Sequence, residues 1–200
     1  MKILIENAPS FAHISIEPRK KLTDDEFFEF CQQNQNLKFE RTKHGNIIVM
    51  TPTGGRTSSR NSKIIIQLGI WNYQANYGEI FDSNGGFHLP DGSMLAPDAA
   101  VVAYHRWEAL TGEEQEKFPP ICPEFIVELK SKSDRIADLQ AKMQDWLNNG
   151  IQLGWLIDPD TETTYIYRPG KATEEVAGFD NTLSGDPVLP GFQLDLKVLK

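Results

Sequence analysis

The chain contains an apolar run that carries two charges, Phe125-Ile126-Val127-Glu128-Leu129-Lys130. Because the side chains of a strand alternate between the two faces of its sheet, Glu128 and Lys130 are expected to share a face. Apolar residues on both faces, with a predicted helix directly afterwards, are typical of an interior strand that is covered on both sides. A buried carboxylate or ammonium costs several kcal/mol unless it is paired or binds something. The run therefore predicts a functional site at which Glu128 and Lys130 are paired or bind a ligand.

A second acid stands at the start of another apolar segment, Pro97-Asp98 followed by Ala99–Ala103. An acid in this place, after a polar turn, is expected at the mouth of a cleft. Two carboxylates and a lysine are the groups that a hard divalent cation and a phosphoryl group require. Mg²⁺ is usually held by one or two carboxylates, waters and phosphate oxygens, and it lowers the pKa of a bound water. A neighbouring lysine can orient or deprotonate the attacking water and stabilise the transition state.

Pro97-Asp98 followed by Glu128-Leu129-Lys130 looks like the PD-(D/E)XK nuclease signature. More narrowly, the chain resembles the Uma2 family of restriction-endonuclease-like proteins from about Thr23 to about Pro169. The matching stretches are Phe39-Glu40, Gly45-Asn46-Ile47-Ile48-Val49-Met50-Thr51-Pro52, Leu95-Ala96-Pro97-Asp98, Val127-Glu128 and the segment from Lys142 to Asp158-Pro159.

The resemblance implies an α/β (α+β) fold with a restriction-endonuclease-like core, a mixed sheet flanked by helices. It also implies hydrolysis of DNA phosphodiesters that depends on Mg²⁺, with Mn²⁺ as a substitute. Asp98 and Glu128 would bind the metal, and Lys130 would activate the water. A homodimer is expected, because cutting both strands of a duplex suits two-fold symmetry.

The resemblance also implies auxiliary residues. Glu40 would be a further acid from the first strand or its entry, and Lys142 would face the cleft from the following helix and touch phosphate. Gln140 is a weaker candidate on the same helix. Many relatives have a tyrosine where this chain has Trp146, so a hydrogen bond from that hydroxyl is lost here or replaced by the indole N–H.

Each of these residues also has an ordinary structural interpretation. Glu128 and Lys130 would form a salt bridge on a half-exposed strand. Glu40 alternates with Lys38 and would face solvent, and Lys142 would belong to a solvated helix face. The sequence leaves these alternatives open.

The composition excludes several other classes of protein. The 200 residues hold 28 acidic and 20 basic side chains, a net charge of −8, which argues against a general DNA-coating protein. Two cysteines and four scattered histidines form no zinc motif, and Gly54-Gly55 lacks the lysine of a phosphate-binding P-loop. No organic cofactor and no membrane span are expected. Glu6 interrupts the first apolar stretch too early for a secretory signal, so a cytoplasmic protein is expected.

The chain is expected to form one domain over residues 23–200, preceded by an arm or extra strand at 1–22. A capping box at Thr23-Asp24-Asp25-Glu26 predicts a helix to about Gln33. A hairpin is expected at 37–51, and a long helix from Ser58 or Ser59 to about Tyr77. Further strands are expected at 79–82, 86–89, 99–104, 124–130, 152–157 and 163–167, a helix at 134–149, and weaker strands at 174–177 and 192–196.

Two functions fit these patterns. The first is a Mg²⁺-dependent endonuclease that hydrolyses DNA phosphodiester bonds, favoured by the intact Glu128 and Lys130 pattern. The second is a catalytically silent module of the nuclease fold that binds nucleic acid or protein, favoured by the acidic net charge.

Overall fold

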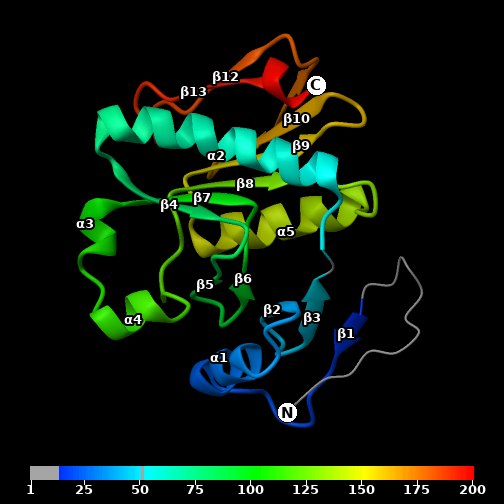
Figure 1. Ribbon diagram of the computed structural model, residues 1–200, viewed down its shortest axis with the longest axis vertical. Helices are drawn as coiled ribbons and strands as arrows, with labels where there is room; N and C mark the ends of the chain where they lie inside the picture. Colours follow the sequence, from blue (N-terminus) through cyan, green and yellow to red (C-terminus); the bar gives the residue numbers. More distant parts are fainter. Residues whose placement is uncertain (1–13, 51) are drawn as a thin grey trace.

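The main sheet has six strands, and the predicted interior strand lies near its centre (Figure 1). The computed structural model describes residues 14–50 and 52–200. In spatial order the strands are β11 (Glu174–Ala177), β10 (Thr163–Tyr167), β9 (Leu153–Asp158), β8 (Phe125–Leu129), β7 (Ala99–Ala103) and β4 (Gly78–Asp82). Only β8 and β9 pair in parallel among these strands, so the sheet is mixed, as expected.

Helices cover both faces of this sheet. The helix α2 (Gly55–Ala75) lies on one face and α5 (Ile136–Asn149) on the other (Figure 1). Phe125 and Val127 belong to the core shared with α2, whereas Ile126 packs with Met143 and Trp146 of α5. Each such fully buried side chain contributes about 2 kcal/mol of hydrophobic free energy. The prediction of an interior strand covered on both sides is confirmed.

A smaller sheet lies beside the first, in the order β1, β3, β2, β6, β5. Its strands are β1 (Ile14–Ile16), β2 (Lys38–Arg41), β3 (Ile47–Met50), β5 (Phe87–His88) and β6 (Met94–Leu95). The helix α1 (Asp24–Gln32) packs Phe27 and Phe30 against it. The strand β1 pairs with β3 as an added strand, and the rest of the predicted arm, residues 1–13, lies outside the described residues. The division into arm and domain stays a prediction.

Local signals place several boundaries well. Thr23 and Glu26 form the predicted capping box of α1, and β2 and β3 form the predicted antiparallel hairpin. Residue 51, the last of that hairpin prediction, lies outside the described residues. Gly150 ends α5 with φ of 113°, a conformation that favours glycine.

The start of α2 was predicted wrongly. The helix begins at Gly55, with Gly54 as its N-cap and no side-chain cap, instead of at Ser58 or Ser59. The Ser58 N–H donates to the Gly54 carbonyl at 3.0 Å, so this serine already lies inside the helix. A serine acts as an N-cap only where its own backbone is not yet helical, whereas Ser58 and Ser59 already have helical neighbours on both sides.

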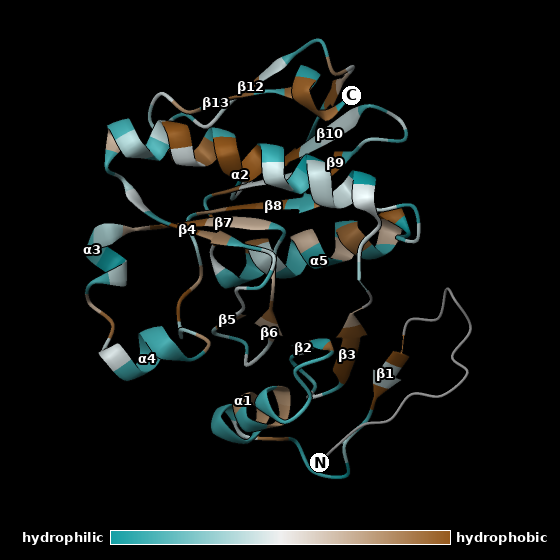
Figure 2. Cartoon of the chain, in the orientation of Figure 1, coloured by the Kyte–Doolittle hydropathy of each residue, from teal (hydrophilic) through white to brown (hydrophobic). Residues whose placement is uncertain are grey.

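The connecting segments add short elements. Residues 105–120, for which no helix or strand was expected, include most of α3 (Tyr104–Trp107) and all of α4 (Gly112–Glu116). The chain ends in β12 (Thr182–Ser184), β13 (Gln193–Asp195) and the 3-10 helix η1 (Leu196–Leu199), which packs against α2. Figure 2 shows that α2 is more hydrophobic along its middle than in its first turns. None of the helices in the described part of the chain has the length and apolar character of a bilayer span.

Candidate active site

Asp98 lies against β8, in the short connection between β6 and β7. Its backbone N–H donates to the Val127 carbonyl at 3.0 Å, and its Oδ2 accepts the Leu129 N–H at 2.7 Å. Both contacts flank Glu128, so the backbone pairing of β7 and β8 brings the two acids to one place. Burial raises the pKa of Asp98, and the hydrogen bond from Leu129 opposes this shift.

Glu128 points from β8 toward α5 and is only 3% exposed. Its Oε1 accepts the indole N–H of Trp146 at 2.9 Å and lies 2.9 Å from the Lys142 Nζ. Burial, reinforced by the negative charges of Asp98 and Glu40, raises the pKa of Glu128 to about 7, against the pull of Lys142. Of the two alternatives considered for residue 146, a lost hydrogen bond or one from the indole N–H, this contact is the second.

Lys142 and Glu40 complete the group. Lys142 Nζ lies 2.7 Å from Glu40 Oε1 and donates to the Ala96 carbonyl at 3.0 Å, while the Ala96 N–H donates to the same Glu40 oxygen at 2.9 Å. Burial lowers the pKa of Lys142, but the charges of Glu128 and Glu40 outweigh it and the net shift is upward. The solvent-facing interpretations of both residues are wrong, because their side chains are 15% and 8% exposed.

We call Glu40, Asp98, Glu128 and Lys142 the carboxylate cluster. It joins three parts of the fold, since Glu40 comes from the small sheet, Asp98 and Glu128 from β8 and the connection beside it, and Lys142 from α5. Each carboxylate receives its hydrogen bonds on one oxygen only. Asp98 Oδ1, Glu40 Oε2 and Glu128 Oε2 have no donor within residues 14–50 and 52–200.

This donor set fits a divalent cation. When all three carboxylates are ionised, they exceed the single ammonium by two negative charges, and carboxylate oxygens are the ligands that Mg²⁺ prefers. Across the described residues, no group of three or more His, Cys, Asp or Glu side chains stands ready around one metal position. A magnesium ion needs only one or two carboxylates, because it keeps several of its waters.

Lys130 lies elsewhere. It follows the last residue of β8, its N–H donates to the Ile157 carbonyl at 2.9 Å, and its Nζ lies 2.8 Å from Asp160 Oδ2 and 3.7 Å from Asp158 Oδ1. Burial lowers the pKa of Lys130, but these acids outweigh it and raise it overall. The salt bridge considered between Glu128 and Lys130 is not formed. The role of Lys130 in catalysis stays a prediction.

Gln140 is half-buried on α5, two residues before Lys142. Its side chain makes no hydrogen bond to the carboxylate cluster in the part of the chain that the structure describes. The structure therefore brings together Glu40, Asp98, Glu128 and Lys142, and leaves Lys130 and Gln140 outside their contacts.

A family described as "Uma2: Putative restriction endonuclease" matches residues 24–197. The chain belongs to the Uma2 family. The resemblance found in the sequence is thus confirmed, over a longer segment than the motifs alone covered.

Among solved structures, this Uma2 protein is similar to a crystal structure titled as a putative nuclease belonging to DUF820 from Anabaena variabilis. The two share 24% sequence identity and a TM-score of 0.73, over 89% of this chain and 97% of that chain. At this identity the likeness establishes the fold. No curated protein matches the Uma2 chain.

Sequence reasoning missed the partners of the two lysines in this Uma2 protein. Asp158-Pro159-Asp160 forms a turn in which Asp158 Oδ1 accepts the Asp160 N–H at 2.9 Å. The same turn also holds Lys130. The parallel pairing of Leu129 with Ile157 places the end of β8 beside this turn, and a single sequence carries no signal for that register.

Proposed function

We propose that this protein is an endonuclease that hydrolyses phosphodiester bonds of DNA with the help of Mg²⁺, for which Mn²⁺ can substitute. The observation that carries the proposal is the set of three carboxylates that each keep one oxygen without a donor among the described residues, with Lys142 as their cation. Membership of the Uma2 family supports a nuclease in general. A bound Mg²⁺ would lower the pKa of a water and neutralise charge on the phosphate.

The residues of the chain have separate tasks in this proposal. Asp98 and Glu128 hold the cation through their unpartnered oxygens. Trp146 and Lys142 fix the Glu128 carboxylate by binding its other oxygen, and Lys142 fixes Glu40 in the same way. Holding these groups in place before substrate arrives removes reorganisation from the reaction step.

Lys130 is proposed to act on the phosphate or on the attacking water. Its partner Asp160 is 47% exposed, so their ion pair is weak and can exchange for a phosphate oxygen. A homodimer would supply two such sites, one for each strand of a duplex.

A second candidate function is a nuclease-fold module that binds without cutting. One observation favours it, since the Lys142 ammonium already bridges Glu40 and Glu128, where it neutralises part of the charge that a metal would balance. In this case Mg²⁺ would not bind to the carboxylate cluster.

Nicking of supercoiled plasmid distinguishes the two functions. We expect the wild type to nick DNA with Mg²⁺ or Mn²⁺ and to stop on chelation, and Asp98→Asn to lose about 100-fold or more in rate. Asp145→Asn is the matched control, because Asp145 is a half-exposed acid on α5 that pairs with Lys43 outside the carboxylate cluster. Mg²⁺ should also raise the unfolding temperature of the wild type and not that of Asp98→Asn.

Equal nicking by the wild type and Asp98→Asn would overturn the assigned site. A wild type that binds DNA, does not nick it and gains no stability from Mg²⁺ would establish the silent module instead.

A further inference from the structure

A second charged feature lies outside the carboxylate cluster. A cavity of about 400 Å³ at the start of α2 is lined by Arg56, Ser59, Arg60, Lys63 and Lys200. We call this the basic cavity. Its lining holds four cations and no acid, in a chain whose net charge is −8. It is therefore a local exception to the charge of the whole protein.

The charges of the basic cavity are unfavourable for the helix that carries them. The 21 residues of α2 include no acid, and its three cations are spaced four and three residues apart, as Arg56, Arg60 and Lys63. Residues at these spacings lie on one helix face, where like charges destabilise the helix. Cations near a helix N-terminus also oppose its dipole. Local stability does not explain this arrangement, and such conflicts are expected at functional sites.

The neighbouring chain neutralises little of this charge. Arg60 Nε donates to the Leu199 carbonyl and Lys63 Nζ to the Val198 carbonyl, both of which are neutral acceptors. Within the described ranges, 14–50 and 52–200, no acid lies within ion-pair distance of Arg56, Arg60 or Lys63. Lys200 pairs with Asp180 at 3.1 Å. Three positive charges thus remain available to an anion.

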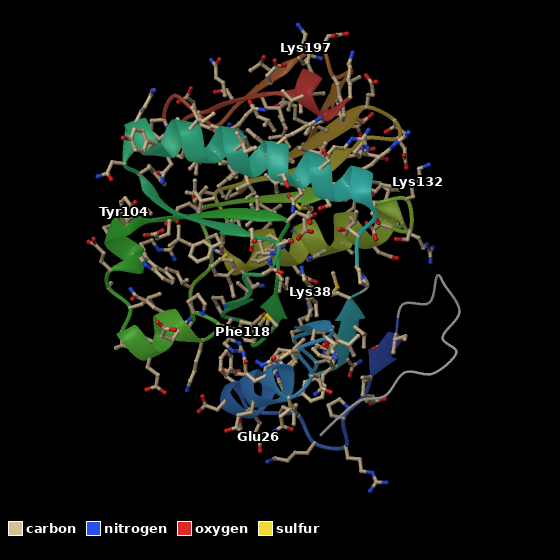
Figure 3. All side chains as sticks on the ribbon, in the orientation of Figure 1. Glu26, Lys38, Tyr104, Phe118, Lys132 and Lys197 are labelled. Carbon is tan, nitrogen blue, oxygen red and sulfur yellow. The ribbon has the colours of Figure 1, made fainter. Side chains whose placement is uncertain are left out.

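The basic cavity lies near the end of β8. The hydrogen bond from Lys130 is the largest cause of the lowered pKa of Asp160, and the charges of Lys132 and Arg60 contribute to it. Figure 3 shows Lys132 at the end of the molecule where α2 begins. The charge of Arg60 thus acts on the turn that holds Lys130, and Lys130 directly follows the strand that carries Glu128.

We propose that the basic cavity binds phosphates of the nucleic-acid backbone and leads that backbone to the carboxylate cluster. The inference rests on the proposed function and names the surface that would position its substrate. Arg56 and Lys63 are about 10 Å apart along the helix axis, at 1.5 Å per residue. That length covers about three nucleotides of one strand, at 3.4 Å each. Phosphate contacts of this kind fix position and orientation without reading the base sequence.

Binding of a labelled DNA duplex, followed by fluorescence anisotropy, tests this surface. The duplex is about 20 base pairs long, and binding is measured in a chelator from about 50 to 200 mM salt. The chelator separates backbone binding from any metal effect. Arg56→Glu is the main variant, because Arg56 is exposed and an acid in the first helical turn does not disfavour the helix. Lys171→Glu is the matched control, an exposed lysine whose side chain forms no ion pair with any described residue.

We expect Arg56→Glu to weaken duplex binding about tenfold and to lower the slope of log K against log salt by about 1. Lys171→Glu should change neither quantity. The proposal is overturned if Arg56→Glu binds like the wild type, or if Lys171→Glu loses as much, since the second result reports total charge and not a local surface.

The outcome is separate from that of the proposed function. Asp98→Asn should bind the duplex as the wild type does and fail to nick plasmid, whereas Arg56→Glu should nick slowly only below saturation. Loss of the Arg56 effect with an intact Asp98 effect contradicts the basic cavity alone. Loss of the Asp98 effect with an intact Arg56 effect contradicts the catalytic proposal alone.

Discussion

Two lysines close to β8 have opposite environments. Lys142 is surrounded by the buried acids of the carboxylate cluster, and the side chains of its two paired members, Glu40 and Glu128, are 8% and 5% exposed. Lys130 is as little exposed as Lys142, but its nearest partner Asp160 is 47% exposed, and its buried second partner Asp158 lies farther away, at 3.7 Å. The burial of the partner, more than that of the lysine, therefore sets what each ion pair contributes. The nuclease-like pattern in the sequence favoured Lys130 for catalysis, whereas the contacts give Lys142 the larger structural role.

The largest expected effect is on stability when Lys142 is removed. Lys142→Met leaves buried carboxylates without their cation, so we expect a loss of about 3 to 5 kcal/mol in the free energy of unfolding. Lys130→Met, the matched control, should cost about 1 kcal/mol or less because of its exposed partner. Urea unfolding at neutral pH measures both. Equal losses would remove the distinction between the two lysines.

Lys130 contributes little to stability, but we expect it to contribute strongly to activity. Lys130→Gln is expected to slow Mg²⁺-dependent nicking about 100-fold, the effect of losing one charged group from a transition state. Its free energy of unfolding should stay within about 1 kcal/mol of the wild type. Nicking rates at saturating DNA, with urea unfolding of the same sample, give both values. Unchanged nicking would exclude Lys130 from the reaction.

Two buried tryptophans allow a similar comparison in the core, because only one of them binds a charged group through its N–H. Trp146→Phe removes the N–H that binds Glu128, whereas Trp155→Phe removes an N–H that is buried with no partner among the described residues. A hydrogen bond to a charged group contributes about 1.5 to 3 kcal/mol, so Trp146→Phe should be the more destabilising by about 2 kcal/mol. Urea unfolding of the two variants tests this. Equal losses would mean that only ring volume matters at residue 146.

The smallest effect is expected at Asp160. Lys130 lowers the pKa of Asp160 below its ordinary value of 3.8, so the folded protein favours the ionised carboxylate. The resulting stability is present above that ordinary value and is lost as pH falls through the lower folded value. Asp160→Asn should therefore cost about 1 kcal/mol or less at pH near 7, and the difference should shrink as the pH falls below the ordinary value of 3.8. Unfolding of both proteins across this range checks the direction, which a constant difference would contradict.

Local patterns were enough for much of the fold. The capping box at Thr23 and the alternation along β8 depend on neighbours in sequence and were found from the residues, whereas the pairing of Asp98 with Glu128 came from the family resemblance. Register between distant segments was not accessible in this way. Asp160 meets Lys130 through the pairing of β8 with β9, and Glu40 reaches Lys142 from another sheet. The charges on α2 were visible, but the cavity that they line depends on a chain end 137 residues beyond Lys63.

The two hydrogen bonds of Ala96 to the carboxylate cluster bear on how the sequence of this protein can change in evolution. Glu40 accepts the N–H of Ala96 and Lys142 donates to its carbonyl, so both peptide groups of Ala96, in the connection between β6 and β7, are held by the carboxylate cluster. The carboxylate cluster thus also connects the small sheet with the main sheet and α5. If the proposed function is right, a relative that no longer cuts DNA should still keep Glu40 and Lys142, because they hold the connection between the two sheets. Retention of this pair would then report on the fold, and retention of Asp98 and Lys130 on the proposed activity.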